Sequence, residues 1–271
     1  MKAIKTMLFF SIVLIFSANA FSGPSTSVKE LKRGNIRITI LYDSFSQNPD
    51  TQTGFGFSCL IETNDKSILF DTGMNPDIVL NNAKALDKDL KQLDIVVISH
   101  NHFDHTDGFP KISEIAGPLT VYFPHSMKDT SLPGKAKKAG DQVVFVKDSI
   151  QIADFCHLTG ELGGLNKEQS LIIDTKFGIV VVTGCSHPGI VNIIKKAKEL
   201  TKKDVYMVLG GFHLTDLSPE EQREVVIGIK SLGVKKCGPC HCSGNRDVFK
   251  QAFGSDYIGM GTGKVIEIGD S

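Results

Sequence analysis

Short apolar segments, rich in Val, Ile and Phe and bordered by Gly, Asn or Asp, recur along most of the chain. Their length and their branched side chains are typical of β-strands. The pattern predicts strands at Ile36–Tyr42, Phe57–Glu62, Ser67–Phe70, Asp94–Ser99, Leu119–Phe123, Gln142–Val146, Leu171–Asp174, Gly178–Thr183, Asp204–Leu209 and Val265–Ile268.

Helical patterns lie between some of these segments. Ser218-Pro219-Glu220-Glu221 has the order of an N-cap, a proline at the first helical position and a capping-box glutamate, and the apolar stripe that follows ends at Gly233. Further helices are expected at Pro76–Leu90, Ile190–Leu200 and Asn245–Phe253. Strands alone, followed by strands that alternate with helices, predict an α+β domain in which sheets pack together beneath outer helices.

The first twenty residues have the pattern of an export signal. Lys2 and Lys5 precede an apolar run from Met7 to Phe16, and small residues follow, ending in Ala18-Asn19-Ala20. A basic start, a short apolar centre and an A-x-A site are typical of secretory signals. We therefore expect residues 1–20 to be removed, leaving residues 21–271 as a single domain that is periplasmic or secreted and free of the membrane. An uncleaved membrane anchor is the alternative, although the run is shorter than the roughly 20 apolar residues that span a bilayer.

The composition and charge of the chain indicate which class of binding partner to expect. The chain has 271 residues, of which 41% are hydrophobic and 22% are charged, which is ordinary for a globular protein. Its 30 basic residues balance its 30 acidic ones, and the basic pairs are scattered. Nucleic acid attracts clustered positive charge, so nucleic-acid binding is not expected, and the expected partner is a small-molecule substrate.

Histidines follow the predicted strands. The strand ending at Ser99 continues into His100-Asn-His102-Phe-Asp104-His105, and later strands continue into Cys185-Ser-His187 and His213. His241 follows a short segment that begins at Val234. Strands of one sheet that end at the same edge bring their following turns together, and such turns are where functional residues concentrate. We therefore expect these side chains to converge.

The cluster from His100 to His105 predicts a metal centre. Three imidazoles and one carboxylate within six residues are ligands for a divalent ion of the zinc type. The alternation of the side chains allows His100 and His102 to bind one ion while Asp104 and His105 bind a second. Two ions roughly 3.5–4 Å apart share one activated water. One or two Zn²⁺ ions are expected, and Mn²⁺ or iron could use the same ligands.

Several motifs resemble one family. The H-x-H-x-D-H cluster from His100 to His105, with Phe70-Asp71-Thr72-Gly73 upstream, resembles the metallo-β-lactamase superfamily, whose fold is an αββα sandwich. Thr183–Asn192, Gly210–Leu214 and His241–Gly244 resemble a subgroup that includes the archaeal dihydropterin-ribofuranosylaminobenzene phosphate synthase of methanopterin biosynthesis. The resemblance extends from Asn35 to Ile268 and implies that the chain is an enzyme.

The resemblance implies a ligand set. His100 and His102 would bind one metal, and the ligands of the other would be Asp104, His105 and His241. Asp71 would orient a ligand histidine from behind. This chain has Cys185 where the superfamily has a bridging aspartate, and upstream, where a further histidine is usual, it has only Glu161 and Glu168. His187 is the expected substitute ligand, and the thiolate of Cys185 is its rival.

The expected reaction is hydrolysis of an ester-type bond of a small molecule, namely a phosphodiester, lactone or thioester. A bound metal lowers the pKa of water from 15.7 to about 7 and polarises the electrophile. Asp104 could accept a proton, and His213 could donate one to the leaving group because imidazole titrates near neutral pH. The chain has no G-x-S-x-G motif, so an acyl-enzyme on serine is not expected.

Three alternatives remain open at this point. The relationship to the synthase subgroup allows a transferase-like reaction whose acceptor is not water. Cys237-Gly-Pro-Cys240 is the tetrapeptide of a thioredoxin site, which allows a thiol redox protein, although a structural disulfide or free thiols are also compatible. A metal-binding module without catalysis is the third alternative.

Overall fold

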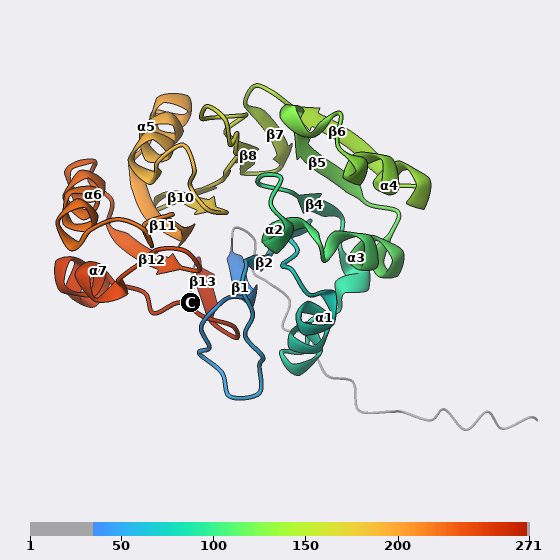
Figure 1. The fold of residues 1–271 in the computed structure, drawn as a ribbon, viewed down its shortest axis with the longest axis horizontal. Helices are drawn as coiled ribbons and strands as arrows, with labels where there is room; N and C mark the ends of the chain where they lie inside the picture. Colours follow the sequence, from blue (N-terminus) through green and yellow to red (C-terminus); the bar gives the residue numbers. More distant parts are fainter. Residues whose placement is uncertain (1–34, 270–271) are drawn as a thin grey trace, which may run out of the picture. The chain divides into compact units, whose positions relative to one another are not determined.

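The computed structural model describes residues 35–269 of the chain. The predicted export signal at residues 1–20 lies outside this part. Among the helices of the described residues, none has the length and apolar character that crossing a membrane requires. Two sheets form the centre of the fold, and the helices lie on their outer faces (Figure 1).

The first sheet has seven strands in the order β13-β1-β2-β3-β4-β5-β6. Their bounds are β1 Ile36–Tyr42, β2 Ser58–Glu62, β3 Ser67–Phe70, β4 Ile95–Val97, β5 Thr120–Pro124, β6 Gln142–Val146 and β13 Val265–Ile268. Pairing is antiparallel from β13 to β3 and parallel from β3 to β6. The strands predicted for this sheet are confirmed to within one or two residues at each end.

The second sheet has six strands in the order β12-β11-β10-β9-β8-β7. Their bounds are β7 Ile150–Ala153, β8 Cys156–Leu158, β9 Leu171–Thr175, β10 Gly178–Thr183, β11 Val205–Gly211 and β12 Lys236–Cys240. Strands β10, β11 and β12 run parallel, whereas β7 to β10 pair antiparallel. The hydrophobic pattern did not predict β7, β8 or β12, because the first two are very short and β12 contains glycine and proline.

The helices cover the two outer faces. They are α1 Pro76–Ala85, α2 Phe103–Thr106, α3 Phe109–Ala116, α4 Ser131–Ala139, α5 Ile190–Thr201, α6 Pro219–Ser231 and α7 Arg246–Phe253, with short 3₁₀ turns at Leu90–Gln92, His125–Met127 and Gly254–Asp256. The predicted capping box at Ser218 and Glu221 is present. The helix expected at Pro76–Leu90 ends earlier, at Ala85, where the chain turns and Asp87 adopts a positive φ of 53°.

The alternation of side chains along the strands produces the layers. In β10, Val180 and Val182 pack between the two sheets, whereas Ile179 and Val181 face helices α5 to α7. The other sheet faces α1, α3 and α4 with residues such as Leu69. Side chains of a strand point alternately to its two faces, so three apolar layers hold four structural layers together. The predicted αββα sandwich is confirmed.

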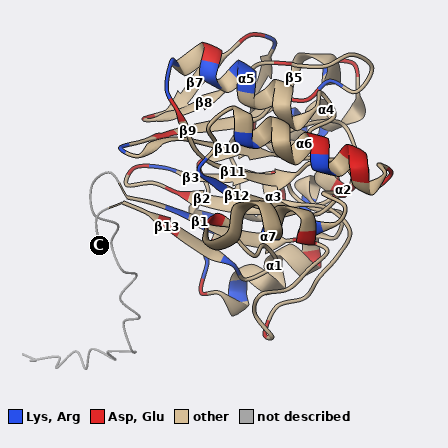
Figure 2. Ribbon diagram, turned by 90° about the vertical axis from the view of Figure 1, so that its left-hand side faces the viewer, with Lys and Arg blue, Asp and Glu red and all other residues tan. Residues whose placement is uncertain are grey.

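Charged side chains do not concentrate on one element. In the view of Figure 2, basic and acidic residues alternate over the helices and strands, and no continuous basic band crosses this side of the molecule.

The tetrapeptide Cys237-Gly-Pro-Cys240 lies within β12 and not at the start of a helix. The side chain of Cys237 packs toward the helices, and that of Cys240 packs between the sheets. Both thiols are free, and burial raises the pKa of each above that of an ordinary thiol. A redox site needs two neighbouring thiols, one of them with a lowered pKa, so the thioredoxin-like interpretation is wrong. A disulfide between these two cysteines is not formed either, since they face opposite sides of the strand.

Candidate metal centre

The parallel strands place the site at one edge of the sandwich. The ends of β3, β4, β10, β11 and β12 lead directly into the segments that carry Asp71, His100, Cys185, His213 and His241. The carboxyl ends of parallel strands lie at the same edge of a sheet, which is where α/β proteins usually bind ligands. The predicted convergence of the strand-end side chains is therefore a consequence of the sheet topology.

Asp71 organises the first histidine loop from behind. Its carboxylate is fully buried, and it accepts hydrogen bonds from the Ser99 backbone N–H, the Ser99 hydroxyl and His105 Nδ1, each at 2.7 Å. Holding Nδ1 of His105 leaves its Nε2 free to face the centre. This is the position that the family resemblance implied for Asp71.

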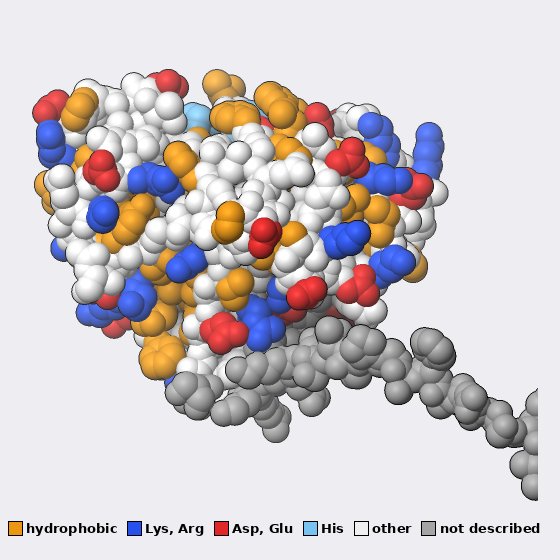
Figure 3. Space-filling model, turned by 90° about the horizontal axis from the view of Figure 1, so that it is seen from below, with side chains coloured by type: hydrophobic (Ala, Val, Ile, Leu, Met, Phe, Trp, Pro, Cys, Tyr) orange, Lys and Arg blue, Asp and Glu red, His pale blue; other side chains and the backbone are white. Residues whose placement is uncertain are grey.

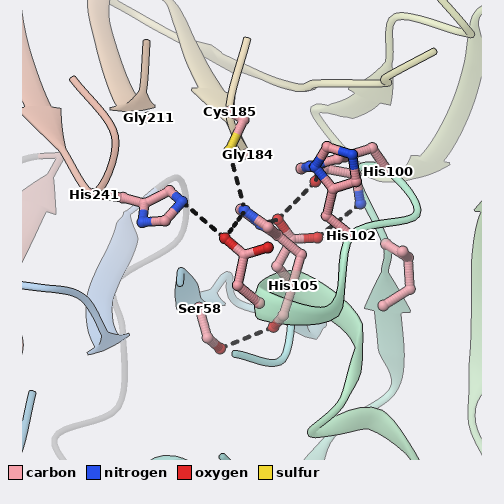
Figure 4. A network of polar contacts seen from close by, with 12 residues as sticks. Ser58, His100, His102, His105, Gly184, Cys185, Gly211 and His241 are labelled. Carbon is pink, nitrogen blue, oxygen red and sulfur yellow. Dashed lines mark hydrogen bonds and ion pairs between the residues drawn. The ribbon is translucent and has the colours of Figure 1, made fainter. Parts of the chain in front are cut away.

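Asp104, His105, Cys185 and His241 form the first group of donors. Their donor atoms all lie within 4.8 Å of one another. The Oδ2 atom of Asp104 lies 3.3 Å from His105 Nε2 and 3.1 Å from His241 Nε2, and His105 Nε2 lies 3.2 Å from Cys185 Sγ. Figure 4 shows His105, Cys185 and His241 pointing toward one another from three separate segments.

Three histidines and the same cysteine form the second group. Donor atoms of His100, Cys185 and His187 lie within 4.8 Å of one another. His102 joins them, because its Nδ1 lies 3.1 Å from His100 Nε2 and 3.2 Å from His187 Nε2. Cys185 therefore belongs to both groups and lies between them, while His187 completes a set of three imidazoles. The sequence presented Cys185 and His187 as rivals for one position, and in the structure donor atoms of both lie within 4.8 Å of one in His100.

The protonation of His100, His187 and Asp104 suits metal binding, whereas the hydrogen bond from Cys242 and burial raise the pKa of the Cys185 thiol. Burial and the neighbouring imidazoles lower the pKa of His100 and of His187, that of His187 to about 4, so both rings are neutral at pH 7. Burial alone would raise the pKa of Asp104, but the neighbouring imidazoles of His105 and His241 hold it well below its ordinary value. Neutral imidazoles and an ionised carboxylate are the forms that bind metals.

His105 behaves differently from the other histidines. Burial acts to lower its pKa, but the carboxylates of Asp71 and Asp104 overcome this and raise the pKa to about 10 in the metal-free protein. A metal at Nε2 must therefore displace a proton from this ring.

His213 and Cys242 form a third group of possible donors with Cys185, and the three donor atoms lie within 4.8 Å of one another. The ring of His213 is 4.3 Å from that of His187, centroid to centroid, and the residue is exposed. The backbone N–H of His213 donates to Cys242 Sγ, which lies 3.4 Å from Cys185 Sγ. The sequence predicted a site role for His213 but not for Cys242. His125 and His157, which the sequence did not assign to the site, belong to none of these groups.

Two carboxylates that the sequence did not assign to the site support its loops. Asp43, directly after β1, accepts a hydrogen bond from the backbone N–H of His241 at 3.0 Å, and burial raises its pKa to about 6. Glu168 accepts hydrogen bonds from the loop that carries Cys185 and His187. The signal for Asp43 was available, because it is a carboxylate at a strand end like the histidines.

Apolar side chains flank the opening. Phe55 and Phe103 are each 56% exposed; Phe103 lies between His102 and Asp104 in sequence, and the ring of Phe55 lies 5.0 Å from that of His241. Figure 3 shows histidine at the surface along one edge of the view, next to hydrophobic side chains.

The donor atoms fit a divalent metal. His241 is buried, and neither of its ring nitrogens has a hydrogen bond of good geometry to a described residue, although Nε2 faces Asp104. Leaving a buried polar group unsatisfied costs roughly 1–3 kcal/mol, so such a group requires an explanation, and a cation between these donors provides one. Imidazole, carboxylate and thiolate together are a donor set for zinc.

Comparison with known proteins gives consistent results. Residues 51–189 match the model of the metallo-beta-lactamase superfamily. The chain is 30% identical to the 7,8-dihydropterin-6-methyl-4-(beta-D-ribofuranosyl)-aminobenzene-5'-phosphate synthase of Methanocaldococcus jannaschii, over 87% of this chain and 98% of the relative. A crystal structure of a metal-dependent hydrolase of the beta-lactamase superfamily superposes with a TM-score of 0.75 at 30% identity, covering 87% of this chain and 100% of the other. The short form of human tRNase Z shares the fold at a TM-score of 0.59 and 13% identity, over 85% of this chain and 98% of the other.

Proposed function

The chain belongs to the metallo-β-lactamase superfamily and is an enzyme, and from this premise we propose that it hydrolyses an ester-type bond of a small molecule, namely a phosphodiester, a lactone or a thioester. Three donor groups share Cys185, and the observation that carries the proposal is the pair of them that includes His100 and His105. Two adjacent groups of this kind suit a binuclear hydrolytic centre.

The residues divide between two ions in this proposal. His100, His102 and His187 would hold one, Asp104, His105 and His241 would hold the other, and the Cys185 thiolate could serve either. Zinc is the proposed metal because thiolate and imidazole favour it, whereas Mn²⁺ prefers oxygen ligands. The ions would act as Lewis acids and lower the pKa of water to about 7.

The remaining residues orient groups and move protons. Asp71 fixes the ring of His105 through its Nδ1. Asp104, which faces two histidines, serves mainly as a ligand and an acceptor. His213 is exposed beside His187, where its imidazole could reach a substrate, and we assign to it the donation of a proton to the leaving atom as water adds across the bond.

The test combines metal analysis with a substrate screen. The wild-type protein is expected to bind two zinc ions and to hydrolyse at least one of bis(p-nitrophenyl) phosphate, an acyl lactone or a thioester. His102→Ala should lose one ion and lower the rate by more than the roughly 100-fold that indirect substitutions near a metal cost. His157→Ala, outside both donor groups, is the matched control and should match wild type.

Two results would contradict the proposal. One is a wild-type protein that stays metal-free in excess zinc, and the other is an unchanged rate in His102→Ala. Zinc bound at full stoichiometry without turnover of any substrate would instead favour a metal-binding module without catalysis.

A transferase reaction is the second candidate, because the relative from Methanocaldococcus jannaschii is a synthase. The two reactions differ in the acceptor. With a substrate identified, the reaction in ¹⁸O-labelled water should place the label in the product if water is the acceptor. Product without label would contradict hydrolysis and would support transfer to an acceptor other than water.

We also propose export, with cleavage after Ala20 leaving residues 21–271 as the mature domain. The support is the sequence pattern of the first twenty residues. The intact mass of the protein from a periplasmic fraction should correspond to a chain beginning at Phe21, and a full-length mass would contradict the proposal.

A further inference from the structure

Two consecutive buried residues, Glu168 and Gln169, lie between the two loops that carry most of the metal-binding side chains. They precede β9, and their exposed fractions are 1% and 0%. Neither contributes a donor atom to the groups described above. Both side chains nevertheless make hydrogen bonds, with different partners, although Oε1 of Gln169 has no hydrogen-bond partner among the described residues.

The carboxylate of Glu168 gathers the backbone of one loop. Its Oε1 accepts hydrogen bonds from the N–H groups of Gly184 at 3.1 Å, Cys185 at 3.0 Å and Ser186 at 2.9 Å. Its Oε2 accepts the N–H of His187 at 2.9 Å. Four successive amides therefore converge on one carboxylate, and Ser186 takes a positive φ of 63° to allow it. Successive amides arranged in this way form a concave anion site.

Gln169 holds the other loop. Its backbone N–H donates to the carbonyl of Ser99 at 2.9 Å, and its Nε2 donates to the carbonyls of Ile98 at 2.8 Å and Tyr122 at 3.2 Å. Ser99 immediately precedes His100. The dipeptide Glu168-Gln169 thus connects the loop of Cys185 and His187 to the loop that carries His100.

The two loops also approach each other directly. A Cβ atom added to Gly184 would lie only 2.2 Å from the Ser99 hydroxyl oxygen, so a side chain at this position would force them apart. Separation of the loops by an ångström would alter the distances among His102, His187 and Cys185. Metal sites tolerate such changes poorly, because ligand distances vary by only about 0.2 Å.

We propose that Glu168 is a positioning residue of the metal centre, and that with Gln169 it sets the distance between the two ligand-bearing loops. The proposal rests on the function proposed above, since it assumes that these loops bind metal. The carboxylate is needed because it can accept all four amides, whereas the amide of a glutamine would present its own N–H groups to some of them. Cys185 and His187 would then lose their fixed orientation.

The test is titration of the purified metal-free protein with Zn²⁺ and Co²⁺. Glu168→Gln should weaken binding of at least one ion by about 10- to 100-fold, the range found for residues that support ligands. It should also reduce the near-ultraviolet absorption of the Co²⁺ form that reports cobalt–thiolate bonding to Cys185. Glu168→Asp, which keeps the charge on a shorter side chain, should restore part of both signals.

Glu161→Gln is the matched control. Glu161 lies on the same loop with a side chain that is 4% exposed, but it accepts from the backbone N–H of Ser126 and pairs with Lys167, away from the ligand loops. It should titrate like wild type. Gln169→Leu should weaken metal binding while leaving the cobalt–thiolate absorption, because it releases only the loop of His100.

The outcomes separate the two proposals. A folded Glu168→Gln with wild-type affinity and wild-type cobalt spectrum overturns the positioning role and leaves the proposed function intact. If Glu168→Gln does not fold, Gln169→Leu and Glu168→Asp decide, and wild-type binding in both overturns the role. A wild-type protein that binds neither ion contradicts both proposals.

Discussion

The two halves of the centre are built in different ways. The first half is one loop, His100 to His105, which supplies four donor residues and rests on a single carboxylate, Asp71. The second half takes Cys185, His187 and His241 from two loops of the other sheet, each held by a carboxylate distant in sequence. The comparison teaches that a contiguous motif brings four donors together on one supported loop, whereas dispersed ligands need a separate support for each loop.

The largest effect should come from His213, which belongs to the second half but to neither proposed ion. His213→Ala is expected to keep both zinc ions and to lower kcat by roughly 10²- to 10⁴-fold, the usual contribution of a positioned proton donor. Metal analysis together with steady-state kinetics on the best substrate checks it. Loss of an ion from this variant would show that His213 is a metal ligand and not only a proton donor.

A smaller effect should distinguish the supports of the two halves. Asp71→Asn removes a partner that contacts a ligand ring directly, and zinc affinity should fall by about 10- to 100-fold. Asp43→Asn alters a contact to the backbone of His241 only, so its effect should lie at the lower end of that range. Competition of each variant with a chromophoric chelator measures both. Equal losses would contradict the proposed difference between direct and backbone support.

A third effect concerns pH, and it also separates the halves. The pKa of His105 is raised to about 10 without metal, so zinc must displace its proton, and affinity should rise by up to tenfold per pH unit from pH 7.5 to 9.5. The pKa of His187 is about 4, so His187 exchanges no proton in this window. Zinc titrations should show a steeper slope in wild type than in His105→Gln, because the Cys185 thiol, whose pKa is also raised, must lose its proton in both.

Stability of the metal-free protein should change in the opposite direction. The folded pKa of His105 lies above its unfolded value of roughly 6.5, so its stabilisation is complete below that pH and is lost as the pH rises toward 10. Thermal unfolding in chelator at pH 7.5 and 9.5 should show a larger loss for wild type than for His105→Gln. An equal loss of stability in both proteins would show that deprotonation of His105 does not cause it.

The sequence predicted the fold where local pattern and packing agree. The strand of Gly178–Thr183 is an unbroken apolar run, and helix α6 has a complete capping box, so both were predicted closely. Strand β12, Lys236–Cys240, was missed because Gly238 and Pro239 disfavour strands, and its pairing with β11 overrides that preference.

The candidate site was predicted as far as residue type and strand ends allow. Residue type and strand ends do not predict that His187 lies beside His102. That position depends on the turn that Glu168 stabilises from across the sheet. Cys242 was missed for a similar reason, since only the approach of two loops brings its sulfur to Cys185. Contacts of this kind arise from tertiary structure and leave no local pattern.

Strand β13 has a consequence for the order of events during synthesis. It pairs antiparallel with β1, so the last strand of the described residues completes the edge of the sheet that the first of them began. The earlier sheet must therefore wait with an open edge while the rest of the polypeptide emerges. In the proposed ligand set, an ion would meet all its ligands only after β12 has formed and placed His241, so we expect metal loading to follow the folding of the second sheet.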